Sequence, residues 1–382
     1  MKIIIATPIY PPEIGGPATY TKALCERLSK THDITVIAYT NSSETVDVFP
    51  GTRLIPVGKG RPLPVRLAVF FVKLLRAART TDVIYVQNAM AAGLPVALVH
   101  MITGVPFVLK FVGDEAWERA SQHRRTTKNL EEFMKKPDGG IKTHLMMMIQ
   151  GFVLRCAQIV TTPSVYLSEA LVRTYGVKRE NAVVNYNAAE NPEIIPFSTT
   201  RIPRQIATTA RLVAWKGIDG IIRTLAKVKK KFPDASLVIA GDGPELENLQ
   251  KIAKESNVSD SVTFLGKVSR AETWHLRKNS EVYVLNSTYE GLPHTVLTSF
   301  AAEIPMIATN IPGTNEAVYH EKTGLLVKPG DDTELATAIE RLLSDKKLAE
   351  NLVIGGTKLL KEKFSWATHI KTLNEILESV VT

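Results

Sequence analysis

Two cations stand five positions apart in the segment Ala210-Arg-Leu-Val-Ala-Trp-Lys-Gly217, directly after a β-branched run. A guanidinium and an ammonium in one strand-to-helix loop can clamp a diphosphate through charge-assisted hydrogen bonds. They can also stabilise negative charge as it develops on a departing group. We therefore predict that Arg211 and Lys216 bind phosphate, although a solvated loop would explain either charge alone.

A polar loop from Asn286 to Pro293 joins a short apolar run to an apolar helical stretch. Glu290 stands just before that helix, where its carboxylate can accept hydrogen bonds from sugar hydroxyls or, equally, cap the helix. The first backbone N–H groups of a helix have no partner within it and favour an anion. The loop is therefore predicted to contact a ligand through Glu290, Gly291, Leu292, His294 and Thr295.

Glycines mark two further loops. Gly15 and Gly16 end the first loop of the chain, and Gly241 and Gly243 follow an apolar run. Without a Cβ atom, the loop at Gly15 and Gly16 lets a phosphate or sugar approach the backbone, although an ordinary turn would look the same. Gly241 and Gly243 permit close packing, and by themselves they are only a strong turn signal. The loops that open the two halves lack Gly-x-Gly-x-x-Gly, which argues against a nicotinamide or flavin enzyme.

Short β-branched runs alternate with longer helical stretches in both halves, a pattern typical of parallel sheets with crossover helices. In the first half the predicted strands are residues 2–7, 34–38, 83–86, 107–111 and 159–161. In the second half they are residues 205–209, 236–240, 262–264, 282–285, 306–308 and 325–327. Residues 332–381 read as helical throughout, with Leu373, Ile376, Leu377 and Val380 on one face.

The alternation lapses between Asn187 and Arg204, a polar segment marked by prolines, which predicts a domain boundary. We predict domains at residues 1–190 and 191–363, and a helix in residues 364–382 that crosses back to the first domain. The fold class is α/β, with two Rossmann-like, doubly wound parallel sheets facing a cleft. Ligands of such sheets bind outside the carboxyl ends of the strands.

Composition limits the class of protein. With 382 residues, 45% hydrophobic and 22% charged, the chain is long enough for two globular domains and too apolar for disorder. Cys25 and Cys156 have no metal-ligand spacing and are too few for a disulfide framework, which favours a reducing, cytoplasmic compartment. The apolar run of residues 3–7 is too short for the hydrophobic core of a signal peptide. The longest apolar stretch, residues 94–112, is interrupted by His100, Gly104, Pro106 and Lys110, so no bilayer-spanning helix is expected.

Most of the net charge of +9 lies in the first half of the chain. Residues 1–190 hold 23 Lys and Arg against 15 Asp and Glu, whereas residues 191–382 hold 24 against 23. Between Arg119 and Lys142 seven cations face three acids, which indicates a surface attracted to anionic lipid, a lipid-phosphate acceptor or nucleic acid. A solvated basic face explains it equally. Because no aromatic-interleaved basic motif is present, we expect no nucleic-acid partner.

Taken in order, these motifs resemble those of the retaining glycosyltransferases with the GT-B fold, often called glycosyltransferase family 4. The resemblance covers nearly the whole chain. It is carried by Gly15-Gly16, the Asn-containing segment before residue 204, Arg211 with Lys216, Gly241-Asp-Gly-Pro-Glu245, Phe264-Leu-Gly-Lys-Val268, Glu290-Gly-Leu-Pro293, Gly324-Leu-Leu-Val-Lys-Pro-Gly-Asp331 and Phe364-Ser-Trp366.

The resemblance implies a transfer of a sugar from a nucleotide diphosphate-sugar, with retention of configuration, to an acceptor held by the first domain. Arg211 and Lys216 would hold the donor diphosphate without a metal or other cofactor, in agreement with the lack of an Asp-x-Asp pair. Glu290 would bind hydroxyls of a hexose-type sugar. The peptide groups of Lys267 and Val268 would meet the nucleobase, and the glycines of both domains would adjoin the donor.

The chain departs from the family at two positions. The family has a second glutamate eight positions after the first, implicated in holding the ribose, where this chain has Thr298, a weaker neutral partner. Many relatives have a histidine after the fourth strand of the first domain, where this chain reads Lys110-Phe-Val-Gly-Asp114. Asp114 is the predicted polar substitute and would orient a hydroxyl or stabilise oxocarbenium-like charge. It equally suits the N-cap of the next helix.

The predicted enzyme is therefore a metal-independent hexosyltransferase. Its acceptor is a glycan, a lipid-linked molecule or a small molecule, and residues 119–142 are predicted to contact the membrane periphery, as in polysaccharide or glycolipid assembly. Two alternatives share the fold. One is a non-catalytic protein that binds nucleotide sugars, which Thr298 in place of a glutamate suggests. The other is a sugar-nucleotide epimerase, which would need no acceptor.

Overall fold

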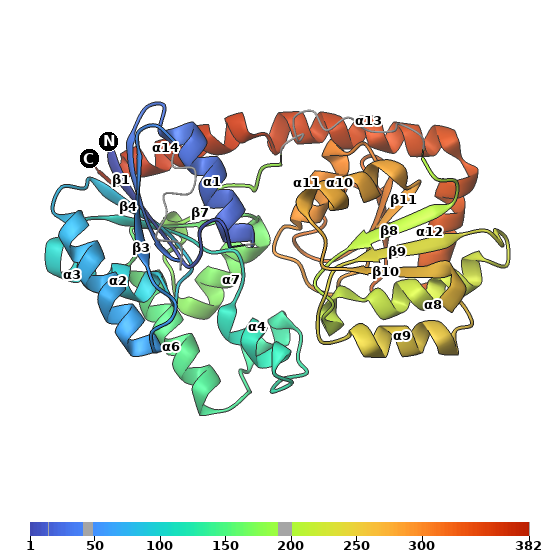
Figure 1. Cartoon of the computed structure of the whole chain (residues 1–382), viewed down its shortest axis with the longest axis horizontal. Helices are drawn as coiled ribbons and strands as arrows, with labels where there is room; N and C mark the ends of the chain where they lie inside the picture. The colour runs from blue at the N-terminus through green and yellow to red at the C-terminus, as the bar shows by residue number, and fades with distance from the viewer. Residues whose placement is uncertain (14, 41–48, 190–200, 382) are drawn as a thin grey trace. The chain divides into compact units, whose positions relative to one another are not determined.

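The computed structural model describes residues 1–13, 15–40, 49–189 and 201–381 (Figure 1). It divides into two compact units, which we call unit 1 (Met1–Asn185 with His369–Thr382) and unit 2 (Tyr186–Thr368). The domain boundary predicted between residues 190 and 191 lies outside the described residues. Each unit contains one parallel sheet, so the predicted α/β class with two parallel sheets is confirmed.

The sheet of unit 1 has seven strands in the order β3-β2-β1-β4-β5-β6-β7. Its strands are β1 (Lys2–Thr7), β2 (Asp33–Tyr39), β3 (Thr52–Val57), β4 (Val83–Gln87), β5 (Phe107–Lys110), β6 (Ile159–Thr162) and β7 (Ala182–Val184). The five predicted strands are present, whereas β3 and β7 were missed. Both missed strands lie at the edges of the sheet and are mostly half-buried, and β3 contains Pro56. Central strands of a parallel sheet read as continuous apolar runs, but edge strands give no such signal.

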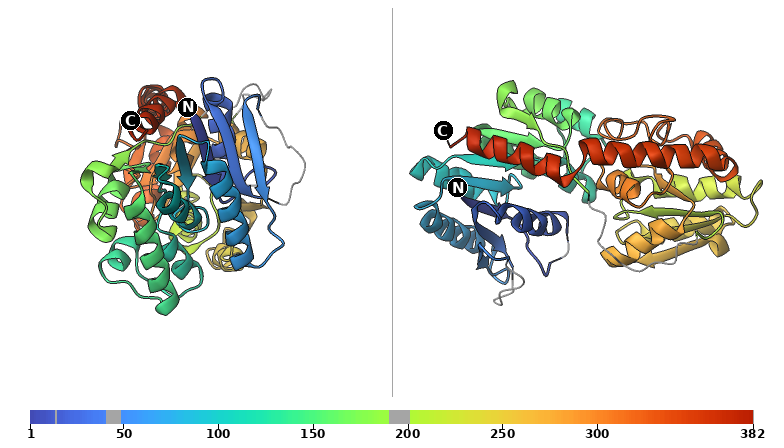
Figure 2. Two further views of the ribbon diagram at one scale, coloured as in Figure 1. Left: turned by 90° about the vertical axis from the view of Figure 1, so that its left-hand side faces the viewer. Right: turned by 90° about the horizontal axis from the view of Figure 1, so that it is seen from above.

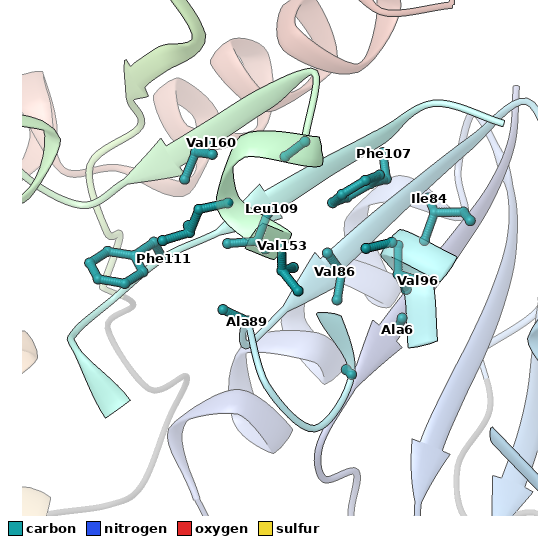
Figure 3. Close-up of a cluster of buried hydrophobic side chains, with 14 of the residues drawn as sticks. Ala6, Ile84, Val86, Ala89, Val96, Phe107, Leu109, Phe111, Val153 and Val160 are labelled. Carbon is teal, nitrogen blue, oxygen red and sulfur yellow. The ribbon is translucent and has the colours of Figure 1, made fainter. Parts of the chain in front are cut away.

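Helices cover both faces of this sheet (Figures 1 and 2). They are α1 (Gly16–Leu28), α2 (Leu63–Ala78), α3 (Gly93–Thr103), α4 (Glu115–Gln122), α5 (Leu130–Lys135), α6 (Ile141–Cys156), α7 (Val165–Tyr175), η1 (Arg179–Asn181) and α14 (Trp366–Ser379), which belongs to unit 1 from His369 onward. Helices α2, α3, α6 and α7 share one core cluster, in which Val96 and Val153 pack with Val86 and Leu109 of the strands (Figure 3). On the other face, Tyr20 of α1 bonds to His369 of α14 at 2.6 Å.

The sheet of unit 2 has six strands in the order β10-β9-β8-β11-β12-β13. They are β8 (Gln205–Thr209), β9 (Ser236–Ala240), β10 (Val262–Gly266), β11 (Val282–Leu285), β12 (Met306–Thr309) and β13 (Leu325–Val327), all of which were predicted. From β8 the chain first builds β9 and β10 on one side and then β11 on the other. The sheet therefore has its topological switch point between β8 and β11, where ligands of such sheets bind.

The helices of unit 2 are η2 (Ala214–Lys216), α8 (Ile218–Val228), α9 (Leu246–Glu255), η3 (Ser259–Ser261), α10 (Arg270–Asn279), α11 (His294–Ala301), α12 (Asp332–Ser344) and α13 (Lys346–Lys363). Helices α8, α9 and α12 pack in one core cluster and α10 and α11 in another. The segment predicted as helical throughout consists of α12, α13 and α14. Asp345, whose side chain caps α13, and the turn at Phe364 separate them.

Candidate functional site

The loops that follow β8 and β11 are fixed to each other by two hydrogen bonds to backbone carbonyls. The N–H of Thr288 donates to the carbonyl of Trp215 at 2.8 Å, and Asn286 Nδ2 donates to the carbonyl of Gly217 at 2.9 Å. Gly217 has φ +60°, and a Cβ atom at this position would lie 2.1 Å from the Asn286 carbonyl oxygen. Only glycine permits so close an approach. The two predicted ligand loops therefore form one structure at the switch point of the sheet.

Lys216 and Glu290 are in direct contact within this structure. Lys216 Nζ donates to Glu290 Oε1 at 2.6 Å, and Ser287 Oγ donates to the same oxygen at 2.7 Å. The lysine side chain is 22% exposed and the glutamate side chain 11%. Glu290 Oε2 accepts no hydrogen bond from the part of the chain that the structure describes. An ammonium carries three N–H donors. The pair thus offers a ligand the remaining N–H donors of Lys216 and the acceptor oxygen Oε2 of Glu290.

The backbone of Arg211 is held by the glycine loop after β9. A Cβ atom on Gly241 would lie 1.8 Å from the Ala210 carbonyl oxygen, and one on Gly243 would lie 2.3 Å from that of Leu212. These glycines therefore allow close backbone packing around the Arg211 segment. The Arg211 side chain is exposed, and among the described residues it has no hydrogen-bond or ion-pair partner. Its guanidinium is available to an anion.

Sequence reasoning missed a third loop, which follows β12 and packs against the backbone of Glu290 and Gly291. Gly313 has φ +81°, and a Cβ atom there would lie 2.4 Å from the carbonyl oxygens of both Glu290 and Gly291. Thr309 Oγ1 donates to the carbonyl of Ser287. The available signal was the turn sequence Ile-Pro-Gly that ends at residue 313, directly after a predicted strand.

Helix α11 begins at His294, with Pro293 as its N-cap and no side-chain cap. Leu292 is buried, whereas His294 is exposed. The hydroxyl of Thr298 donates to the carbonyls of His294 and Thr295, at 3.0 and 3.1 Å. Its hydrogen is thus used within the helix, and it offers a ligand only an acceptor.

Lys267 and Val268 follow β10, the edge strand on the far side of β9. The Gly241 N–H donates to the carbonyl of Gly266 at 2.8 Å, which ties this turn to the loop after β9. Lys267 is exposed, and Val268 packs against the core cluster of α10 and α11. Both residues therefore lie at the same carboxyl edge as Arg211, two strands away from it.

In unit 1, Gly15 is the N-cap of α1 and Gly16 its first residue, and no side chain caps this helix. Among the described residues, a Cβ atom on Gly16 would meet no atom within 4 Å, whereas one on Gly15 would lie 2.6 Å from Ile9 Cδ1. At Gly16 the described residues therefore leave the start of α1 open to a ligand within unit 1.

Asp114 has a different environment from the one predicted beside a reacting sugar. It is the N-cap of α4: its Oδ1 accepts from the Trp117 N–H at 2.8 Å, and its Oδ2 accepts from Gln150 Nε2 at 3.0 Å and from the Tyr175 hydroxyl. The side chain is fully buried, and this burial raises the pKa of the carboxyl group despite the hydrogen bonds. The structure thus shows the helix-capping alternative, because residues from α6 and α7 enclose the carboxylate.

Two family descriptions together match most of the chain. The description "Glycosyl transferase 4-like domain" matches residues 15–188, and "Glycosyl transferases group 1" matches residues 193–359. The lipopolysaccharide core biosynthesis glycosyltransferase LpsD of Rhizobium meliloti is 32% identical over 200 residues. That alignment spans 51% of this chain and 57% of LpsD, about half of each protein.

Solved structures extend the similarity to the full length of the chain. Sucrose-phosphate synthase from Thermosynechococcus elongatus superposes with a TM-score of 0.79 at 19% identity, covering 99% of this chain and 98% of that one. Anabaena Alr3699/HepE, solved in complex with UDP-glucose, superposes with a TM-score of 0.77 at 19% identity, covering 99% and 100%. At a sequence identity of 19%, this structural similarity establishes the shared fold alone.

The fold is GT-B, and the chain belongs to the group 1 glycosyltransferases. The resemblance seen in the sequence motifs is thereby confirmed. Arg211, Lys216 and Glu290 all lie in the region that the group 1 description matches.

Proposed function

We propose that this protein transfers a hexose-type sugar, with retention of anomeric configuration, from a nucleotide diphosphate-sugar to an acceptor. The observation that carries the proposal is the contact between Lys216 and Glu290 at the switch point of unit 2, beside the exposed Arg211. These groups match the two parts of such a donor, a diphosphate and a polyhydroxylated sugar. The complex of HepE with UDP-glucose supports the same class of donor.

Arg211 and Lys216 act on the leaving group. As the acceptor hydroxyl oxygen bonds to the anomeric carbon, the bond from that carbon to the diphosphate oxygen breaks. The electron pair stays on the diphosphate oxygen, negative charge grows there, and this oxygen can take up the proton that the acceptor loses. Lys216 keeps its bond to Glu290 with one N–H and donates the remaining two to the diphosphate. Arg211 adds a second cation, whose guanidinium has no other partner among the described residues. We propose that these two cations make a metal ion unnecessary.

The remaining residues bind the other parts of the donor. Glu290 Oε2 accepts hydrogen bonds from sugar hydroxyls, and the uncapped N-terminus of α11, at His294 and Thr295, faces the phosphates. The peptide groups of Lys267 and Val268 meet the nucleobase. Thr298 offers the ribose only a neutral oxygen.

For the acceptor, we propose a glycan, a lipid-linked molecule or a small molecule bound by unit 1 near the open start of α1. Basic residues among 119–142 contact the membrane periphery, and both cysteines are free, which fits a cytoplasmic location. No helix among the described residues is long and apolar enough to cross a bilayer.

The test is incubation of the protein with a panel of labelled nucleotide sugars, with and without lipid extract, followed by identification of the products. We expect acceptor-dependent transfer that Lys216→Ala abolishes while the circular dichroism spectrum stays unchanged. If the protein instead converts the nucleotide sugar to an epimer in the absence of acceptor, it is an epimerase. Binding of donors without turnover across the panel would show a non-catalytic protein.

A further inference from the structure

Unit 1 exposes an unusual number of large apolar side chains on three neighbouring helices. Among the described residues sixteen such side chains are exposed, and nine of them lie on α2, α3 and α6. We call this set the apolar face: Leu63, Val65, Val72, Leu98, Met101, Ile102, Ile141, Leu145 and Met148. The exposed apolar residues of unit 2 (Ile202, Leu265, Tyr319 and Ile354) are single and scattered, as on ordinary protein surfaces.

The apolar face lies on neighbouring helices. Helix α2 packs against α3, and α3 packs against α6, all on the same side of the sheet (Figure 1). On α6, Ile141, Leu145 and Met148 follow the i, i+4, i+7 spacing that places side chains on one face of a helix. Ile141 is 89% exposed, Met148 70% and Met101 65%. Exposed apolar side chains gathered on adjacent helices mark a candidate site of interaction.

The charges of these helices have a single sign. Helices α2, α3 and α6, which the structure describes in full, contain no aspartate or glutamate, and they carry Arg66, Lys73, Arg76, Lys142 and Arg155. Each of α8, α9, α12 and α13 in unit 2 contains at least one acid. Helix α4 packs against α6, and the segment that follows α4 exposes Arg124, Arg125, Lys135 and Lys136, together with the acids Glu131 and Glu132. The charges of the three helices and the excess of cations beside them favour a partner that is both apolar and anionic.

We propose that the apolar face binds the surface of an anionic lipid bilayer. The side chains of α2, α3 and α6 enter the boundary between headgroups and acyl chains, and the lysines and arginines meet the lipid phosphates. A second copy of this chain does not fit, because a two-fold contact would place the cations of one face against those of the other. The proposal extends the membrane contact proposed above for residues 119–142 and is independent of the donor site in unit 2.

The test is sedimentation of the full chain with vesicles of phosphatidylethanolamine and phosphatidylglycerol, compared with phosphatidylcholine vesicles. We expect binding to the anionic vesicles that weakens with salt. The triple variant Met101→Ser, Ile141→Ser, Met148→Ser removes apolar surface only and should lower the partition coefficient at least about tenfold. The matched triple variant Ile202→Ser, Leu265→Ser, Ile354→Ser, exposed residues of unit 2, should change it less than about twofold.

A charge variant and a lipid-free measurement complete the design. Arg124→Glu with Lys142→Glu should reduce binding to anionic vesicles and leave the circular dichroism spectrum unchanged. The proposal is overturned if wild-type protein does not bind anionic vesicles at low salt, or if both serine triples bind equally. Light scattering without lipid provides a further check. The proposal is also overturned if wild-type protein is a dimer and if this dimer dissociates in the Met101, Ile141 and Met148 triple variant but not in the matched triple variant of unit 2. Donor turnover with a water-soluble acceptor reports separately on the proposed enzymatic function.

Discussion

Glu290 and Asp114 are two carboxylates predicted for the same kind of task, and the structure gives them different environments. Each follows a strand of a parallel sheet and precedes a helix. Glu290 shares one oxygen with Lys216 and Ser287 and keeps the other without a partner among the described residues. Asp114 is fully buried and uses both oxygens for hydrogen bonds within unit 1. A carboxylate at a strand end is thus chemically available only where its neighbours leave an oxygen unpaired.

The largest effect is expected from Lys216→Ala. It removes a cation from the diphosphate and leaves Glu290 without its partner, so transfer should fall by about 10²–10³-fold or more. Initial rates with saturating donor measure this. Lys254→Ala, an exposed lysine of α9 away from the switch point, is the control. A Lys216→Ala variant with near wild-type kcat would contradict the role given to this residue.

Glu290→Gln should lower kcat/KM by about 10–100-fold, because an amide accepts weaker hydrogen bonds from sugar hydroxyls than a carboxylate does. The melting temperature should change little, since the amide keeps the shape of the carboxylate and its oxygen can still accept hydrogen bonds from Lys216 and Ser287. Steady-state kinetics and thermal unfolding of the same preparation measure both quantities. An unfolded or strongly destabilised variant would mean that Glu290 is structural, as Asp114 is.

Asp114→Asn should give the opposite result. If the amide oxygen of asparagine keeps the hydrogen bond from the Trp117 N–H, the amide nitrogen faces the Nε2 donor of Gln150, so the free energy of unfolding should fall by about 2 kcal/mol. The transfer rate per folded molecule should stay within a few-fold of wild type. Urea unfolding and initial rates measure the two effects. A variant of normal stability with a hundredfold lower rate would restore the catalytic interpretation of Asp114.

The effect of Asp114→Asn should also depend on pH. Because burial raises the pKa of Asp114 in the folded protein, the stability it contributes is present below its unfolded value of 3.8 and is lost as pH rises through the folded pKa. The difference in unfolding free energy between wild type and Asp114→Asn should therefore be largest in acid and shrink toward neutral pH. Urea titrations between pH 4 and 8 measure it. A difference that grows with pH would show that the folded protein favours the charged carboxylate.

The smallest effect is expected from Thr298→Val. The hydroxyl of Thr298 donates its hydrogen to backbone carbonyls of its own helix. Loss of the hydroxyl should therefore change the KM for donor by less than about twofold. Thr298→Glu is the informative partner variant, because it introduces the carboxylate that the family has there. A large loss of donor affinity in Thr298→Val alone would show that the threonine itself binds the nucleotide.

The sequence predicted the central strands and the chemical groups of the site, but not the contacts that decide their roles. All six strands of unit 2 were predicted from short apolar, β-branched runs that alternate with helical stretches, and Lys216 and Glu290 were selected from loops 74 residues apart. The edge strands β3 and β7 lack that pattern. The closed environment of Asp114 depends on Gln150 and Tyr175, which are 36 and 61 residues away. Nothing local to Asp114 indicates them, since both come from other helices.

The most direct test of the account is calorimetric titration of a panel of nucleoside diphosphates into wild type, the double variant Arg211→Ala with Lys216→Ala, and Asp114→Asn. We predict that at least one diphosphate binds wild type and Asp114→Asn with similar affinity. The Arg211 and Lys216 double variant should bind it at least about 100-fold more weakly. If the double variant binds every diphosphate as wild type does, the switch point of unit 2 is not the donor site.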